Sequence, residues 1–223
     1  MLFCYNSIMI DIDKWIQQNK EANFCQFQSG IIKTSYHMDG IRVGKLRKLA
    51  KLIDDNYFCS ESYEKLLLSG FVIAYRKDDF DKKTDDIYRY LLCCDDWSLV
   101  DSFCSSFSKK NNKNIESFLQ KISFDDHSYV IRFVLVMYLR MFLDDNHIDF
   151  IIDYCLKLKR KEHEILMAIG WLLQCASIDY YDKVIDKIGY FGKEIIKIYQ
   201  RKMLDSYRID DRKKEEVRSL CIK

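Results

Sequence analysis

Two side chains with distinct chemistry stand four residues apart in the segment CDDWSLVDSFC, residues 94–104. They are Trp97 and Asp101, and residues at positions i and i+4 of an α-helix share one face. A carboxylate can stabilise positive charge that develops during a reaction and can orient an attacking water molecule. The face of an indole ring attracts cations. One of the preceding aspartates, Asp95 or Asp96, is placed to cap a helix that starts at Trp97.

Two further residues extend this pattern along the chain. Arg132 follows Trp97 by 35 residues, and Trp171 follows Arg132 by 39. In a stack of helix pairs, separations of this size place residues on equivalent helices of successive pairs. We therefore predict that these three residues and Asp101 form a row on one concave surface. The alternative is structural, because helical tryptophans are usually core residues and Asp101 with Arg132 could form an ion pair that only stabilises the fold.

The elements that carry these residues are predicted to be helices. The chain has 223 residues, no proline and only seven glycines, whereas strand-and-turn folds depend on both residue types at their corners. Apolar side chains recur at helical spacing in residues 41–53. Further helices are expected near residues 61–76, 83–93, 97–108, 113–122, 127–143, 147–159, 163–177, 179–188, 191–204 and 210–220.

The short connections between these helices predict antiparallel pairs stacked side by side, with about 35–45 residues per pair. No linker or break in composition divides the chain, so we expect a single domain over residues 1–223. The apolar segments 127–143 and 163–177 are expected to lie deep in the stack. Because Arg132 interrupts the first of them, its guanidinium requires an anionic partner.

The charge pattern leaves two interpretations open. Net charge is only +2, so total charge does not point to a nucleic-acid partner. Residues 41–53 hold five basic residues and no acid, and residues 150–223 carry 16 Lys and Arg against 12 Asp and Glu. Such faces either bind an anionic partner or are solvated helix surfaces. Residues 78–101 hold eight aspartates against three basic residues, which is unfavourable near a phosphate backbone.

The sequence lacks the motifs that are typical of several classes of enzyme. The four histidines are dispersed and no Cys-x-x-Cys occurs, so no metal site is expected. Neither a glycine-rich phosphate loop nor a Gly-x-Ser-x-Gly segment is present. We therefore expect no metal-dependent enzyme, nucleotide hydrolase or serine hydrolase, and no cofactor.

The cysteines and the apolar segments indicate the cellular compartment of the protein. Nine cysteines, odd in number and irregularly spaced, favour a reducing cytoplasm over an extracellular location. No apolar run approaches the roughly 20 residues of a membrane-spanning helix, and the start of the chain lacks the basic region of a signal peptide. We expect a cytoplasmic protein that makes no membrane contact. Because a closed solenoid domain of this size often acts alone, we also expect a monomer.

Five segments resemble, in order and spacing, the DNA alkylation repair family, whose best-known members are the bacterial AlkD-type DNA glycosylases. They are IRVGKLRKLAKLI (41–53), YEKLLLSGFVIAY (63–75), DDWSLVDSFC (95–104), IRFVLVMYLRMFL (131–143) and MAIGWLL (167–173). The resemblance covers roughly residues 20–210, and the Trp-x-x-Val-Asp and Ala-Ile-x-Trp segments are its most specific parts. It implies an all-α fold, a right-handed superhelix of antiparallel helix pairs of the HEAT-like or ARM type.

The resemblance also implies a function. Enzymes of the family excise cationic alkylpurines, such as 3-methyladenine and 7-methylguanine, from double-stranded DNA by hydrolysing the N-glycosidic bond, without flipping the base into a pocket. The matching catalytic residues are Asp101, Trp97 and Trp171. The candidate DNA-binding residues are Arg132 and, in the basic segment, Arg42, Lys45, Arg47 and Lys48.

Two departures from the family pattern keep other functions open. Family glycosylases usually carry an arginine three residues after the second tryptophan, where this chain has Gln174, and many have a proline where it has Gly44. Relatives without glycosylase activity bind branched or unusual DNA. The candidates are therefore an alkylpurine glycosylase, a non-catalytic DNA-binding protein that recognises branched or damaged DNA, and a protein-interaction scaffold. An apolar or acidic concave surface would favour the scaffold.

Overall fold

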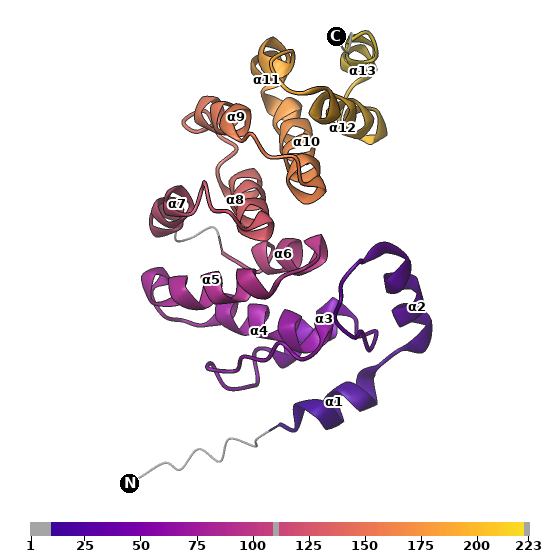
Figure 1. Cartoon of the computed structure of the whole chain (residues 1–223), viewed down its shortest axis with the longest axis vertical. Helices are drawn as coiled ribbons and strands as arrows, with labels where there is room; N and C mark the ends of the chain where they lie inside the picture. The colour runs from indigo at the N-terminus through magenta and orange to yellow at the C-terminus, as the bar shows by residue number, and fades with distance from the viewer. Residues whose placement is uncertain (1–9, 109–111, 221–223) are drawn as a thin grey trace. The chain divides into compact units, whose positions relative to one another are not determined.

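The computed structural model describes residues 10–108 and 112–220, and over these residues the chain is all-helical, without a strand (Figure 1). The chain divides into two compact units, residues 1–107 and residues 108–223. The helices of unit 1 are α1 (Ile12–Asn19), α2 (Ala22–Ile31), α3 (Val43–Leu49), α4 (Tyr63–Tyr75), the 3-10 helix η1 (Phe80–Lys83), α5 (Thr84–Cys93) and α6 (Trp97–Cys104). Those of unit 2 are α7 (Asn112–Lys121), α8 (Ser128–Met141), α9 (Ile148–Lys157), α10 (His163–Asp179), α11 (Tyr181–Ile188), α12 (Lys193–Asp205) and α13 (Asp211–Arg218).

Unit 1 is built around α4, which contacts α3, α5 and α6. Ser62 caps this helix, with its Oγ accepting a hydrogen bond from the N–H of Lys65 (3.4 Å). Gly70 lets the ring of Tyr90, on α5, lie against the α4 backbone, since a Cβ at this glycine would come within 2.7 Å of the ring. The Tyr90 hydroxyl then donates to the carbonyl oxygen of Leu99 on α6 (3.2 Å). One buried tyrosine therefore joins α4, α5 and α6.

A buried carboxylate on α4 fixes the linker that precedes α3. Glu64 is fully buried. Its oxygens accept hydrogen bonds from the main-chain N–H groups of Asp39, Gly40 and Ile41 at 3.0, 2.8 and 3.3 Å. Gly40 has φ +80°, and a Cβ there would lie 2.6 Å from the carbonyl oxygen of Glu21, so the turn requires glycine. The linker thus sets where the basic helix α3 begins.

Unit 2 is formed of two layers of helices. In one layer α10 packs between α8 and α12, and in the other α9 contacts α11 (Figure 1). Lys183 of α11 pairs with Asp149 of α9 (2.7 Å), and one turn further along Lys187 lies 3.9 Å from Asp153. The first pair joins residues 34 positions apart, and the second keeps this separation. Helices α9 and α11 therefore run parallel and in register, with one structural repeat every 34 residues.

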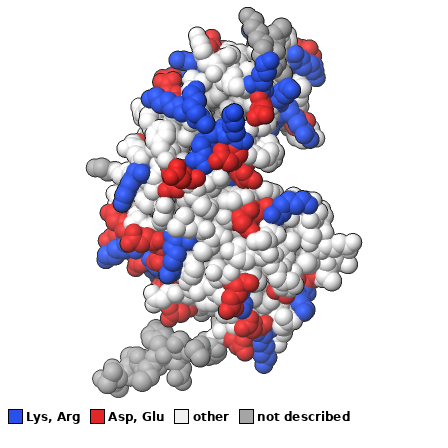
Figure 2. All heavy atoms as spheres, in the orientation of Figure 1, with Lys and Arg blue, Asp and Glu red and all other residues white. Residues whose placement is uncertain are grey.

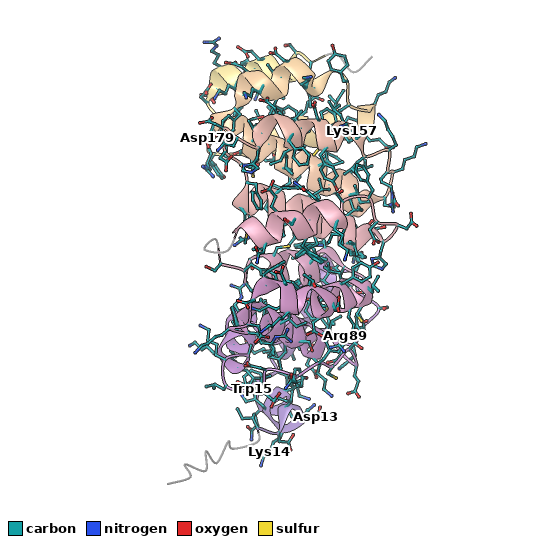
Figure 3. The ribbon with its side chains drawn as sticks, turned by 90° about the vertical axis from the view of Figure 1, so that its left-hand side faces the viewer. Asp13, Lys14, Trp15, Arg89, Lys157 and Asp179 are labelled. Atoms are coloured by element: carbon teal, nitrogen blue, oxygen red, sulfur yellow. The ribbon has the colours of Figure 1, made fainter. Side chains whose placement is uncertain are left out.

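The two helices of a repeat run antiparallel. Lys157 at the end of α9 and Asp179 at the end of α10 lie at opposite edges of the unit (Figure 3). The connection between these helices contacts the equivalent connection of the preceding repeat. There Arg160 donates hydrogen bonds to the carbonyl oxygens of Asp125 and Asp126 at 2.9 and 2.8 Å.

The all-α fold class is confirmed, and every helix predicted between residues 61 and 220 corresponds to an observed one. The differences lie near the N-terminus. The predicted helix 41–53 ends at Leu49, and Asp54 Oδ1 accepts from the N–H of Asn56 (2.7 Å) in the turn that follows. Helices α1 and α2 were not predicted, although Ile12, Trp15 and Ile16 of α1 have the spacing of an amphipathic helix. The repeat of 34 residues is slightly below the predicted range.

The handedness of a superhelix and a single domain over residues 1–223 stay predictions. None of the helices in the described ranges is both long and apolar enough to span a bilayer.

Two glycines provide a matched test of the packing in unit 1. Gly70→Ala is expected to destabilise the protein by about 1–3 kcal/mol, because the added methyl group collides with the Tyr90 ring. Gly44→Ala, in α3, has open space around the new Cβ and should stabilise by about 0.5–1 kcal/mol through helix propensity. Urea unfolding followed by circular dichroism measures both. A loss of stability in both variants would contradict the packing described here.

Candidate nucleic-acid interface

Asp96 fixes the start of α6, the helix that carries Trp97 and Asp101. Its Oδ1 accepts hydrogen bonds from the N–H and the hydroxyl of Ser98 at 2.8 and 2.5 Å, so Asp96 is the helix cap. Its Oδ2 accepts from the main-chain N–H of Lys33 (2.9 Å), and the residue is only 3% exposed. One buried carboxylate therefore caps the helix and binds it to the segment after α2.

The neighbouring Asp95 strengthens this attachment. It accepts hydrogen bonds from the hydroxyl of Thr34 and from the N–H and hydroxyl of Ser35, each at 2.6 Å. The sequence places these aspartates in an acidic stretch that is unfavourable near phosphates. Both carboxylates are instead engaged within unit 1, where they hold the start of α6.

Helix α6 buries one face and leaves the other accessible. Leu99, Val100 and Phe103 are fully buried. Trp97 is 39% exposed, and Asp101, one turn later, is half-buried. The indole and the carboxylate therefore share the side of the helix that faces away from the core of unit 1. Trp97 is therefore not a core residue of unit 1.

Arg47 of α3 is bound to the C-terminal end of α6. Its Nη2 donates to the carbonyl oxygen of Ser102 (3.3 Å) and to the hydroxyl of Ser105. The guanidinium also lies 5.1 Å from the centroid of the Phe71 ring. Arg47 is thus placed beside the helix of Trp97 and Asp101, with part of its hydrogen-bonding capacity used to hold that helix.

The other candidate cations of α3 have different surroundings. Arg42 and Lys45 both pair with Glu21, at 2.9 and 3.0 Å. Hydrogen bonds from Lys45 and Arg42 lower the pKa of Glu21, so its carboxylate offsets one of the two positive charges. Arg42 also lies over the ring of Phe24, 4.6 Å from the centroid. Lys48 is exposed and forms no ion pair with any residue in the described ranges.

Arg132 links two helices of unit 2. It is only 5% exposed, and its Nη1 donates to the carbonyl oxygen of Glu164 in the first turn of α10 (2.8 Å). Trp171 follows Glu164 by seven residues, which is about 10 Å along the helix at 1.5 Å per residue. Arg132 and Trp171 therefore belong to neighbouring helices of one layer.

Gln174, which stands where family glycosylases carry an arginine, is used inside unit 2. It is 8% exposed, and its Nε2 donates to the hydroxyl of Ser206 at the end of α12 (3.2 Å). Its Oε1 accepts a hydrogen bond from the thiol of Cys175 (3.6 Å). The carboxamide thus fastens the chain after α12 to the second half of α10.

Positive charge near Trp171 comes from residues that the sequence analysis missed. Burial raises the pKa of the Cys175 thiol, while the positive charges of Arg208 and Lys202 and a hydrogen bond with Trp171 lower it. Arg208 is exposed and lies two residues after Ser206. The sequence contains no local signal for it, because its place follows from the packing of α10 against α12, where Gln174 contacts Ser206.

The predicted site residues divide between the two units. Trp97 and Asp101 belong to unit 1, whereas Arg132 and Trp171 belong to unit 2. Trp97 and Asp101 share one face of α6, while Arg132 on α8 contacts α10 at Glu164, seven residues before Trp171. The single row that would join the pairs stays a prediction.

The units also differ in charge. Residues 108–223 carry 22 Lys and Arg against 18 Asp and Glu, while residues 1–107 carry 14 against 16. In Figure 2 the basic side chains gather most densely over the part of the chain that Figure 1 shows as α9 to α13. Among the described residues no group of side chains could hold a metal ion.

Fold and site together define a class, a helical-repeat protein with an accessible tryptophan–aspartate pair on one unit and an excess of basic residues on the other. A family model described as DNA alkylation repair enzyme matches residues 16–189. The chain therefore belongs to the DNA alkylation repair enzyme family, and this membership gives it a role in DNA repair with DNA as its partner. Neither the curated proteins nor the solved structures contain a significant match.

Asp96→Ala tests how firmly the start of α6 is held. It removes the cap of α6 and leaves the N–H of Lys33 without its acceptor, so we expect a loss of about 2 kcal/mol. The matched control is Asp11→Ala, which removes the exposed cap of α1 and should cost about 1 kcal/mol or less. Chemical unfolding compares the two. Equal losses would show that Asp96 acts as an ordinary surface cap.

Proposed function

We propose that the protein is a monomeric DNA glycosylase that hydrolyses the N-glycosidic bond of cationic alkylpurines, such as 3-methyladenine and 7-methylguanine, in double-stranded DNA. The observation that carries this proposal is the accessible Trp97–Asp101 pair on α6, in a chain of the DNA alkylation repair enzyme family. A DNA-binding surface without chemistry has no need of a carboxylate, since a carboxylate repels the phosphate backbone.

Hydrolysis of this N-glycosidic bond requires little acid catalysis by the protein. An N-alkylated purine carries a positive charge, and when the bond to C1′ breaks its electron pair moves to the purine and neutralises that charge. Positive charge then develops on the deoxyribose, where the carboxylate of Asp101 stabilises it. A water molecule oriented by the same carboxylate attacks C1′ and passes a proton to Asp101, which releases it to solvent.

The aromatic and basic residues have binding roles in this proposal. The indoles of Trp97 and Trp171 present electron-rich faces to the cationic sugar or base. Arg132, which is 5% exposed and bound to Glu164, positions the start of α10 in this proposal. Exposed cations such as Lys48 would contact the flanking backbone. Because Asp95 and Asp96 hold α6 in place, the Trp97–Asp101 pair is pre-organised for its substrate.

The state of the cysteines supports a cytoplasmic location within this proposal. The seven cysteines in the described ranges are all free thiols, including the adjacent Cys93 and Cys94. Burial raises the pKa of Cys94 and of Cys155, which keeps both thiols protonated and unreactive. Free thiols in this number are typical of a reducing compartment.

Asp101→Asn tests the catalytic role directly. The variant keeps the shape of the side chain but not its charge, so release of 7-methylguanine and 3-methyladenine from methylated duplex DNA should fall by about 10²–10³-fold. Chromatography of the released bases under single-turnover conditions measures the rate. The control is Asp153→Asn, an exposed aspartate on α9, which should leave the rate unchanged.

Absence of base release by the parent protein, under conditions where a known alkylpurine glycosylase is active, would overturn the catalytic proposal. Salt-sensitive binding to branched DNA would then favour the non-catalytic alternative, in which Gln174 has removed a group that catalysis needs.

Arg208→Ala tests the cation whose charge acts on Cys175, one helical turn after Trp171. If Arg208 contacts a phosphate, its loss weakens binding to duplex DNA irrespective of sequence and lowers the slope of log affinity against log salt concentration by about 1. Arg212→Ala is the control, because that side chain is 89% exposed and pairs with Glu216. Fluorescence anisotropy with a labelled duplex gives both slopes, and equal slopes would rule out a specific phosphate contact at Arg208.

A further inference from the structure

A basic surface of unit 2 lies at the N-terminal ends of α10 and α12. It is a groove of about 640 Å³ between the end of α9, the connection that leads to α10, and the turn that leads to α12. Apolar side chains that are almost fully buried form its floor, among them Leu166, Phe191 and Ile195. The groove is at the edge of the unit that Lys157 marks in Figure 3.

The lining of the groove is strongly basic. Lys159, Lys161 and Lys193 are exposed, and none of them pairs with an acidic residue in the described ranges. The one acidic residue in the lining is Glu194. Three lysines without acidic partners around one groove repel each other, and an anionic ligand would remove this repulsion.

A fourth cation holds the groove in shape. Arg160 donates to the carboxylate of Glu162 (2.8 Å) and to the carbonyl oxygens of the preceding connection. Its hydrogen bonds lower the pKa of Glu162 to about 2, so this carboxylate stays ionised and paired. Arg160 therefore positions the connection, while Lys159 and Lys161 on either side of it stay available.

The opposite wall offers features that suit a nucleotide chain. Tyr190 is 76% exposed and lines the groove, so its ring is available for stacking against a base or a sugar. Gly192 is the N-cap of α12 and provides no side-chain cap, so the main-chain N–H groups of the first turn, whose residues line the groove, receive no side-chain acceptor from it. Phosphate oxygens are acceptors for both lysine and backbone donors.

We infer that this groove binds a phosphodiester segment of DNA, as a contact separate from the Trp97–Asp101 pair. The inference builds on DNA as the partner of the family but does not depend on glycosylase activity. Lys159, Lys161 and Lys193 neutralise successive phosphates, the first turn of α12 donates to one of them, and Tyr190 stacks on the adjoining nucleotide. The contact recognises the backbone and carries no preference for sequence.

The test compares two double variants with the same change in charge. Lys159→Ala/Lys161→Ala removes two groove lysines, whereas Lys183→Ala/Lys187→Ala removes two lysines of α11 that pair with α9 and do not line the groove. Anisotropy titrations with an unmodified labelled duplex over a range of salt concentrations give the affinity and the salt slope. For the groove variant we expect a slope smaller by about 2 and an affinity about tenfold lower at roughly 0.1 M salt.

The control variant should bind like the parent protein. If both variants lose the same affinity for DNA, binding depends on the overall charge of unit 2 and not on the groove. If the groove variant binds like the parent protein, the groove does not contact DNA. Either result overturns the inference. Thermal unfolding of each variant verifies that it is folded.

A second experiment locates the contact along the DNA by removing the charge of single phosphates. Replacing single phosphates of the duplex by methylphosphonates should weaken parent binding at a short run of positions, and the groove variant should be insensitive at those positions. Equal sensitivity in parent and variant would overturn the inference. Because the DNA is unmodified at its bases, the result is independent of whether the protein excises alkylpurines.

Discussion

The arrangement of unit 1 depends on one buried carboxylate, that of Asp96. It receives hydrogen bonds from the main chain of Lys33 and from Ser98, and the hydroxyl of Ser98 is in turn 2.9 Å from the hydroxyl of Tyr63 on α4. Burial raises the pKa of Tyr63, which keeps this hydroxyl protonated and able to donate. The segment after α2, the start of α6 and the central helix α4 are therefore joined through a single network. Such a network is stabilising only while all its members are satisfied.

This network explains how a large aromatic side chain can be kept partly exposed. An isolated tryptophan at a helix start gains free energy by burial, and a helix free to rotate would bury it. Fixing the N-terminus of α6 by two aspartates, while Leu99 and Phe103 fill the core, prevents that rotation. The exposure of Trp97 is thus a consequence of where its neighbours are bound. The free energy gained by burying Leu99 and Phe103 and by capping α6 therefore keeps the indole of Trp97 on the surface, where a ligand can contact it.

Much of this could be predicted from the sequence because it is local. Helical periodicity predicted the elements from residue 61 onward, the spacing of Trp97 and Asp101 predicted their shared face, and the aspartates before Trp97 predicted a cap. The partners of the charged residues could not be predicted in this way. The bond from Arg47 to Ser102 joins residues 55 positions apart, and helical periodicity contains no information about such pairs. The use of Gln174 to bind Ser206 depends likewise on how two helices pack.

Gln174 replaces the arginine that family glycosylases usually carry, while positive charge in the same region is provided by Arg208 and Lys202. An arginine there would put its cation at a residue that is now 8% exposed, and the glutamine instead makes neutral hydrogen bonds to Ser206 and Cys175. The positive charge that acts in this region belongs to Arg208 and Lys202, and Arg208 lies beyond the residues that the family model matches. The N–H donors of a guanidinium on an exposed turn can bind an external anion, whereas those of a buried guanidinium must form hydrogen bonds with acceptors of the protein itself. Losing the arginine at position 174 therefore need not remove the electrostatic attraction for DNA, because that attraction depends on where the charge is and not on which residue of the family pattern carries it.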